Sequence, residues 1–325
     1  MKTNFIKMTC VILLAGIALI WGCKKDNSAQ PATSTVPNNN SNTNTDNYSS
    51  MADFFAKNGV AAQTFTITNS TGGSFATPQG TVITIPANTF LNNLNQQVTG
   101  TVTITFKDIY KKSDMLLSNM PTTMANGMPL KSAGEFYINA TAGGNPVNLA
   151  NTITVKQPFN SPADLNMRPF VISGIDTAGW KPADSSTGQV AVDSSYMLYQ
   201  LIQLCAPLTS GSWCNSDNPS YFSIYTQGTL TLTETDTASN YNTQVYLLFK
   251  SINTTDACHT YGGNDFNFTN CVPIGLQCTA VAVGVKNGKI YSSFIPVTIT
   301  ANQTVKFSMS ETTTANFKSQ LAALN

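Results

Sequence analysis

Alternation of apolar and polar side chains runs through most of the chain after residue 60, and it constrains the fold more than any other feature. In residues 101–106, valine, isoleucine and phenylalanine alternate with three threonines. A period of two predicts strands with one buried and one exposed face. The segments that show it are 65–67, 102–106, 136–140, 153–155, 230–232, 245–249, 281–285 and 305–309. Short strands separated by Gly, Pro and Asn predict an all-β fold of two antiparallel β-sandwich domains, Ig-like or ZU-like.

Two short segments are predicted to be helical, and one cluster predicts a domain boundary. Residues 51–57 are expected to form one or two turns, with Phe54 and Phe55 packing on the first domain. Phe317, Leu321 and Leu324 have helical spacing, which predicts a C-terminal helix docked on the core. Pro, Ser and Asn gather at 159–162. We therefore expect a first sandwich over 51–159 and a second β-rich domain over 160–325.

Charge and histidine content exclude several function classes. Only 10% of the residues are charged, the net charge is +1, and there is a single histidine. A chain without a basic field is poorly suited to nucleic acid. One histidine disfavours a Ser-His-Asp triad and excludes a multi-histidine metal site. We expect no cofactor, no resident metal and no nucleic-acid partner.

The N-terminus has the order of a secretory signal: Lys2 and Lys7, a short apolar run, then small residues. The run is too short to span a bilayer, which needs about 20 apolar residues. Leu19–Cys23 (Leu-Ile-Trp-Gly-Cys) resembles the bacterial lipobox, although Trp21 is bulkier than usual at its position. The resemblance implies removal of residues 1–22 and acylation of Cys23, which would anchor the protein to a lipid bilayer.

Residues 23–50 are predicted to be the lipidated cysteine followed by a disordered tether. The segment is rich in Asn, Ser and Thr, so it buries too little apolar surface to offset its ordering entropy. Lys24-Lys25-Asp26 is similar to the start of Bacteroidota-type lipoproteins. The resemblance implies an outer-membrane location, with the periplasmic face and the cell surface both open.

The first domain carries a further resemblance. Residues 77–81 (Thr-Pro-Gln-Gly-Thr), 83–90 and 98–102 resemble the ZU-type β-sandwich of ankyrins and netrin receptors. They resemble its relatives in Bacteroidota lipoproteins more closely, and residues 132–137 (Ser-Ala-Gly-Glu-Phe-Tyr) continue that pattern. The match covers about residues 64–158 and consists of glycines, prolines and core apolar positions. It implies a fold and an interaction module. Residues 213–217 (Trp-Cys-Asn-Ser-Asp) resemble an element of the companion region and imply no chemistry.

The cysteines of the mature body all fall in the second half: Cys205, Cys214, Cys258, Cys271 and Cys278. An oxidising envelope favours disulfides, and five cysteines allow at most two. The simplest pairs are Cys205 with Cys214, and Cys258 with Cys271 or Cys278. A zinc site that includes His259 is an alternative that the spacing disfavours.

Other candidate sites are weaker. Trp213, Tyr221, Phe222 and Tyr225 could form an aromatic ligand platform, although core packing is the ordinary role of such residues. Thr177 and Thr237 sit in Asp-Thr-Ala sequences that resemble the O-glycosylation motif of Bacteroidota envelopes. Asp217, Asp256 and Asp265 are the acids that a glycoside hydrolase would need to bring together.

These features favour a non-enzymatic binding, adhesion or interaction module anchored in the envelope, with a glycan or an envelope protein as its partner. No nucleophile stands beside a matching base, and there is no phosphate loop. A structural component of an envelope assembly is the second hypothesis. A carbohydrate-active enzyme is the third.

Overall fold

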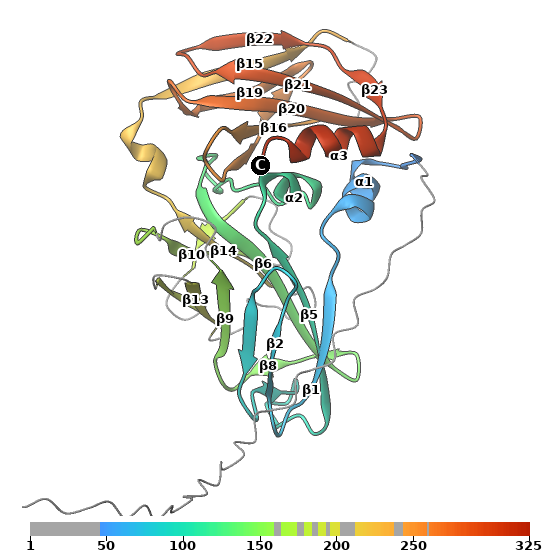
Figure 1. The fold of residues 1–325 in the computed structure, drawn as a ribbon, viewed down its shortest axis with the longest axis vertical. Helices are drawn as coiled ribbons and strands as arrows, with labels where there is room; N and C mark the ends of the chain where they lie inside the picture. The colour runs from blue at the N-terminus through green and yellow to red at the C-terminus, as the bar shows by residue number, and fades with distance from the viewer. Residues whose placement is uncertain are drawn as a thin grey trace, which may run out of the picture.

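The structure is a computed structural model that describes residues 46–158, 164–173, 179–183, 188–192, 196–201, 212–236, 243–258 and 260–325. The predicted signal peptide, Cys23, most of the tether, Cys205, Thr177, Thr237 and His259 lie outside these residues. The described part forms two stacked β-sandwiches with short helices between them (Figure 1). The predicted all-β sandwich class is confirmed. No helix in the described ranges is long and apolar enough to cross a bilayer.

The first sandwich, the lower one in Figure 1, packs two larger sheets face to face. One sheet has the order β1 (Gln63–Thr68), β5 (Thr101–Ile109), β6 (Lys131–Ala142), β14 (Ser212–Asn218), β10 (Arg168–Ser173) and β11 (Lys181–Pro182), with β7 (Asn145–Pro146) beside β6. The other has the order β12 (Gly188–Val192), β13 (Tyr196–Leu201), β9 (Ile153–Pro158), β3 (Val82–Ile85) and β2 (Gly73–Ala76). A small pair, β4 (Phe90–Leu91) and β8 (Asn148–Leu149), closes one end.

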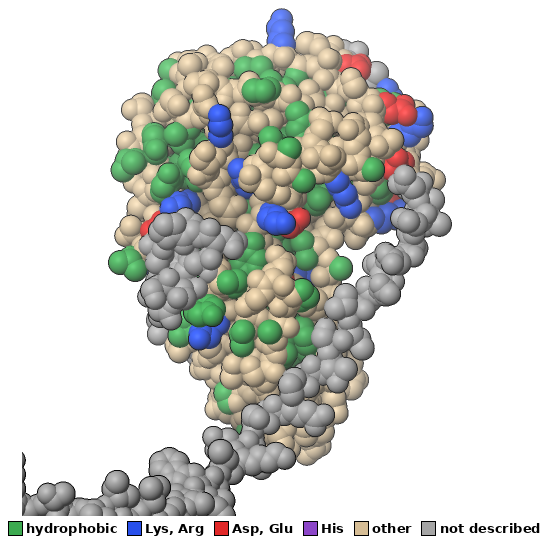
Figure 2. Space-filling view, viewed as in Figure 1, with side chains coloured by type: hydrophobic (Ala, Val, Ile, Leu, Met, Phe, Trp, Pro, Cys, Tyr) green, Lys and Arg blue, Asp and Glu red, His purple; other side chains and the backbone are tan. Residues whose placement is uncertain are grey.

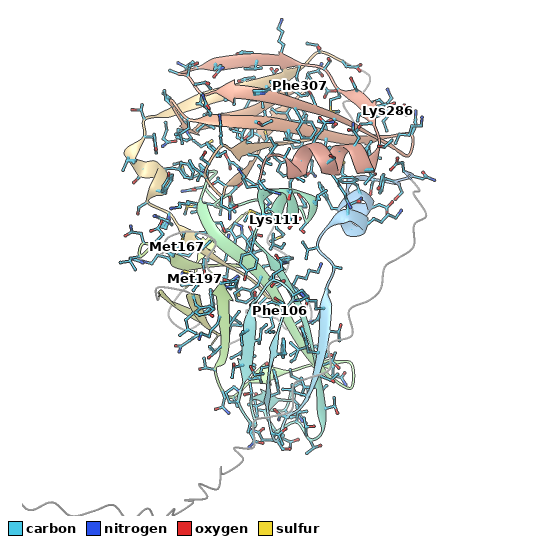
Figure 3. The ribbon with its side chains drawn as sticks, viewed as in Figure 1. Phe106, Lys111, Met167, Met197, Lys286 and Phe307 are labelled. Carbon is cyan, nitrogen blue, oxygen red and sulfur yellow. The ribbon has the colours of Figure 1, made fainter. Side chains whose placement is uncertain are left out.

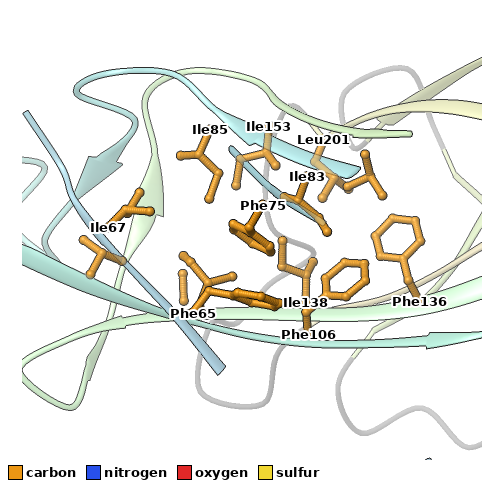
Figure 4. Packing of buried hydrophobic residues seen from close by; sticks show 14 of the residues in the cluster. Phe65, Ile67, Phe75, Ile83, Ile85, Phe106, Phe136, Ile138, Ile153 and Leu201 are labelled. Atoms are coloured by element: carbon orange, nitrogen blue, oxygen red, sulfur yellow. The ribbon is translucent and has the colours of Figure 1, made fainter. Parts of the chain in front are cut away.

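The alternation seen in the sequence builds the first core directly. Val102, Ile104 and Phe106 of β5 are fully buried, whereas the threonines between them face outward. Figure 4 shows Phe65 and Phe75 at the centre of this core, with their rings stacked at a centroid distance of 3.8 Å. Each of these two rings comes from a different sheet, so the contact joins the two layers.

The second sandwich, the upper one in Figure 1, also has two sheets. One has the order β18 (Thr260–Gly262), β19 (Asp265–Pro273), β15 (Gln227–Glu234) and β22 (Gln303–Phe307). The other has the order β17 (Thr255–Ala257), β16 (Thr243–Phe249), β20 (Gln277–Lys286), β21 (Lys289–Thr298) and β23 (Ser310–Thr312). The β15–β22 pair is parallel, so this sheet departs from the purely antiparallel arrangement that the sequence suggested.

A layer of helices covers the outer face of the β16–β20 sheet: α1 (Met51–Asn58), α2 (Lys112–Leu117) and α3 (Thr314–Ala322). Phe317 and Leu321 of α3 are fully buried there, which confirms the docked C-terminal helix. The helix predicted over 51–57 is confirmed as α1. Phe54 and Phe55 pack in one cluster with Leu116 and Leu117 of α2, within the predicted first domain, and with strands β16 and β20 of the second sandwich, which the prediction did not include.

The folded part of the chain begins closer to the N-terminus than the sequence suggested. Residues 46–50 were predicted to belong to the tether, but Tyr48 is buried, and its N–H donates to the Gly288 carbonyl at 2.9 Å. The Tyr48 hydroxyl lies 2.8 Å from the Thr314 hydroxyl at the start of α3. A single aromatic side chain therefore docks a segment whose composition alone indicates disorder.

The predicted boundary at 159–162, whose residues lie outside the described ranges, does not separate the two sandwiches. β13 pairs with β9, and β14 pairs with β6, so strands up to residue 218 complete the first sandwich. The second sandwich begins near η1 (Tyr221–Ile224), a turn of 3₁₀ helix. A sequence break marks a connection between strands, and strand pairing decides which domain each strand joins.

Candidate functional site

The structure separates the four residues of the predicted aromatic platform. Trp213 is on β14, whereas Tyr221 and Phe222 are on η1. Phe222 is buried in the second core, and Tyr225 packs against the same core. The Nζ of Lys131 lies 4.8 Å from the Tyr221 ring centroid, on the face of that ring. These side chains therefore do not form one strip, and the ordinary packing role applies to Phe222 and Tyr225.

Trp213 instead lines a cleft of about 600 Å³ between the two sandwiches, which we call the aromatic cleft. Its lining includes Phe55, Asn119, Trp213, Gln244, Tyr261 and Phe266. Trp213 comes from the first sandwich and packs on Tyr137 with ring centroids 5.3 Å apart. Tyr261 comes from β18 of the second sandwich and is 77% exposed. The two sandwiches thus contribute one aromatic side chain each to the same cleft.

Amide groups lie beside these rings. The Tyr246 hydroxyl is within hydrogen-bonding distance of the Asn119 and Gln244 amide oxygens, at 2.7 Å for Asn119. A phenol has one proton, so it can donate to only one amide and must accept from the other. Burial raises the pKa of Tyr246, which keeps this hydroxyl protonated. The network presents fixed donors and acceptors without net charge.

No charged side chain of the described residues lines the aromatic cleft. Two other clefts, of about 720 Å³ and about 360 Å³, differ from the aromatic cleft because lysines line both of them. Lys112 lines both of them, and its Nζ donates to the Phe249 carbonyl at 2.7 Å. Figure 2 shows basic side chains scattered over a mainly uncharged surface, with no continuous basic patch on that face. The aromatic cleft is therefore suited to an uncharged ligand.

The acids named for the enzyme hypothesis lie in different surroundings. Asp217 and Asp256 are fully buried, and Asp265 on β19 accepts a hydrogen bond from Thr233 at 2.7 Å. None of the three lines the aromatic cleft or the two lysine-lined clefts. Burial raises the pKa of Asp256 to about 8, so this carboxyl is mainly protonated at neutral pH. The arrangement does not present these acids as an exposed pair.

The cysteines divide between the two cores. Cys214 is buried in the first core, whereas Cys258, Cys271 and Cys278 belong to the second. The latter three are thiols in the structure, so the predicted pairs among them are not formed. Burial raises the pKa of the Cys258 thiol to about 11 and those of Cys271 and Cys278 to about 12. Within the described residues, no three His, Cys, Asp or Glu side chains gather as a metal site.

Sequence reasoning named Asp217 on β14 but missed that a second fully buried acid, Glu135 on β6, lies near it. Burial and the nearby Asp217 raise the pKa of Glu135, and burial raises that of Asp217. Both acids belong to the segments that carried the family resemblance, residues 132–137 and 213–217. The sequence signal that could have identified Glu135 is its position next to Phe136 in a predicted strand, because both residues are buried when each face of the strand is covered by other elements.

Comparison with known proteins adds little to this geometry. No protein-family model matches the chain, and no curated protein is similar to it. A solved structure described as BcpA, the major pilin subunit of Bacillus cereus, matches at 10% identity and a TM-score of 0.18. The match covers 78% of this chain and 100% of that one. A likeness this low carries no argument about function.

Proposed function

We propose that this chain is a lipid-anchored protein of the bacterial outer membrane whose two sandwiches bind an uncharged ligand without chemical turnover. The observation that carries the proposal is the aromatic cleft, which combines ring faces with amide groups and lacks charged side chains among the described residues. Rings stack on the apolar faces of sugars, and amides recognise hydroxyl groups. A neutral glycan fits this chemistry better than a polyanion.

The positions of exposed apolar residues also favour binding over assembly. The large exposed side chains of the described part are Leu94, Leu165, Ile224 and Tyr261, and they belong to four separate segments. An assembly interface normally needs a continuous face burying about 800 Å² on each partner. Of these four residues, only Tyr261 lines one of the clefts described above.

A binding experiment tests the ligand site. The full chain is titrated with neutral cello-, malto- and chito-hexaose, with heparin as the charged comparison. Tyr261→Ala should weaken the neutral-glycan affinity at least tenfold, about 1.4 kcal/mol, because it removes an exposed stacking face. Tyr221→Ala, an aromatic outside the cleft, is the matched control and should bind as the parent does. Heparin-only binding, or glycan cleavage, would contradict the proposal.

The anchor has its own test. Cys23→Ala, compared in the native host with the parent chain, should abolish labelling by a palmitate analogue, because it removes the thiol that accepts the lipid. Labelling that persists in the variant would refute anchoring through this cysteine while leaving the ligand site untouched.

A further inference from the structure

The loop that follows β16, residues 250–253, lies between the two lysine-lined clefts. Ser251, Ile252 and Asn253 line both clefts. The Ser132 N–H donates to the Asn253 carbonyl at 2.9 Å, and the Asn253 side-chain amide donates back to the Ser132 carbonyl at 3.0 Å. These two bonds join a loop of the second sandwich to β6 of the first, so the loop is fixed where the sandwiches meet.

Lys112 brings a positive charge to this loop. The residue is only 6% exposed, and its Nζ donates to the carbonyl of Phe249, the residue before the loop, at 2.7 Å. An ammonium group has three donors, so two remain. No carboxylate of the described residues forms an ion pair with Lys112. Burial lowers the pKa of Lys112, and no acid opposes that effect. Because a buried ammonium without a counter-charge is costly, an anion bound beside Nζ would stabilise this site.

The other charged side chains at the two clefts do not compensate Lys112. Lys131 forms an ion pair with Asp164 at 2.9 Å, and Asp164 is the only acidic side chain among the described residues that line either cleft. Lys111 and Lys250 line one cleft each and add positive charge. Lys111 and Met167, which line the cleft of about 360 Å³, are labelled in the middle of Figure 3. This local excess of positive charge occurs in a chain with 17 basic and 16 acidic residues.

Backbone donors add to this charge. Among the described residues, no acceptor is bonded to the N–H groups of Ser251, Ile252 and Asn253. Ser251 has a φ of 60°, in the left-handed region. Successive N–H groups around a left-handed residue can converge on one anion. The loop and the Lys112 ammonium therefore offer several donors and no negatively charged group.

We propose that a small organic monocarboxylate binds in the cleft of about 360 Å³, with its carboxylate at Lys112 and the 251–253 backbone. One uncompensated ammonium matches one negative charge, which favours a carboxylate over a doubly charged phosphate. Tyr110, Met167 and Ile252 also line this cleft and provide apolar contacts for the body of the ligand. Its volume is near the lower end for ligand sites, about 300–1,000 Å³, so a small acid fits better than a polymer. The site is separate from the aromatic cleft and does not depend on the proposed glycan function.

Calorimetry on the full chain tests the site with sodium benzoate as the probe. Benzamide, which has the same shape without the charge, and inorganic phosphate are the comparison ligands. Benzoate should bind once, with a Kd on the order of 1 mM or lower, and both comparison ligands should bind at least about tenfold more weakly. Lys112→Met keeps a long unbranched side chain but removes the ammonium, so it should weaken benzoate binding at least about tenfold.

Lys306→Met is the matched control, because Lys306 on β22 is an exposed lysine that lines neither cleft. It makes the same change in net charge and should bind benzoate as the parent does. No saturable benzoate binding to the parent chain would overturn the proposal, and so would equal binding of benzamide or an equal loss in both variants. Tighter binding of phosphate would overturn the assignment to a carboxylate. The comparison of benzoate with benzamide on the parent chain decides the question even if Lys112→Met fails to fold.

Discussion

Buried acids on the two faces of one sheet differ in their hydrogen bonding. Asp108 on β5 faces the first core and lies opposite Phe136 of the neighbouring strand, β6. Glu135 is the residue next to Phe136, so its side chain is on the other face of the sheet, toward the second sandwich. Neither side chain has exposed surface. Asp108 accepts from the hydroxyls of Thr77 and Thr81 at 2.6 and 2.7 Å, whereas Glu135 accepts from nothing in the described structure.

The difference shows that burial alone does not define the role of an acid. Gln63 and Gln79 add longer hydrogen bonds to Asp108, at 3.4 and 3.3 Å, so this carboxylate joins β1, β5 and the loop that precedes β3. It acts as a structural link. Glu135 makes no such link among the described residues, so no hydrogen bond offsets the cost of its burial.

Removing the structural link should have the largest effect. Asp108→Ala leaves the Thr77 and Thr81 hydroxyls and the Gln63 amide without their carboxylate acceptor in a buried site, whereas Gln79 keeps its 2.8 Å bond to the backbone carbonyl of residue 108. We expect a loss of about 3–5 kcal/mol in the free energy of unfolding, measured by urea denaturation. Asp108→Asn keeps the shape and should cost less. If Asp108→Ala costs under about 1 kcal/mol, the contrast between the two faces fails.

Changing the backbone beside Glu135 should have the next largest effect. Gly134 has a φ of 133°, and a Cβ there would lie 2.6 Å from the Tyr110 ring. Gly134→Ala should cost about 2–3 kcal/mol in urea denaturation. Gly143→Ala is the control, since its φ is also positive at 56° but nothing lies within 4 Å of the added Cβ. Equal costs for both variants would show that only φ matters and that the packing on Tyr110 does not.

The pH dependence separates an acid that holds a proton from one that does not. Asp256 has its pKa raised to about 8 in the folded chain, whereas an unfolded aspartate ionises near 4. The folded state therefore keeps a proton that the unfolded state loses, so stability is full below about pH 4 and falls as pH rises toward 8. The slope should be about 1.4 kcal/mol per pH unit for each such carboxyl. Urea denaturation at pH 5, 6 and 7 should show that Asp256→Asn removes one such slope, and an unchanged slope would count against protonation of this group.

The smallest effect should come from Glu135 itself. Glu135→Gln loses no hydrogen bond and removes the need to bind a proton, so it should not lower the free energy of unfolding at pH 7. The unfolding temperature of Glu135→Gln should be measured together with that of Asp108→Asn, because both substitutions replace a carboxyl by an amide of the same shape. A loss of several kcal/mol in Glu135→Gln would mean that the carboxyl has a structural partner that the described residues do not include.

Much of the fold was predictable from local pattern. The alternation at 101–106 becomes β5, and the sequence Asn287-Gly288 forms the turn that joins β20 to β21, with positive φ at both residues. The domain division was not predictable, because pairing of β14 with β6 depends on contacts about 80 residues apart. The docking of Tyr48 was missed for the same reason, since its partners are Gly288 and Thr314.

The candidate sites were less predictable than the strands. Trp213 was singled out as a ligand-contacting aromatic and does line a cleft, but its partner there is Tyr261 rather than Tyr221. The sequence around Trp213 and that around Tyr261 do not indicate that the two residues line the same cleft, because they belong to different sandwiches. The Glu135–Asp217 pair needs the β6–β14 register to be known. The lipid anchor and the glycosylation sites remain predictions.

The docking of Tyr48 has a mechanical consequence. If the chain is anchored through Cys23, tension in the anchor enters the folded body at residues 46–48, which bond to the second sandwich and to the start of α3. The first sandwich, although earlier in sequence, lies outside that line of force. The Tyr48–Gly288 bridge and the Tyr48–Thr314 contact would bear the load first. Detachment of residues 46–58 would lengthen the predicted tether while leaving the first sandwich folded.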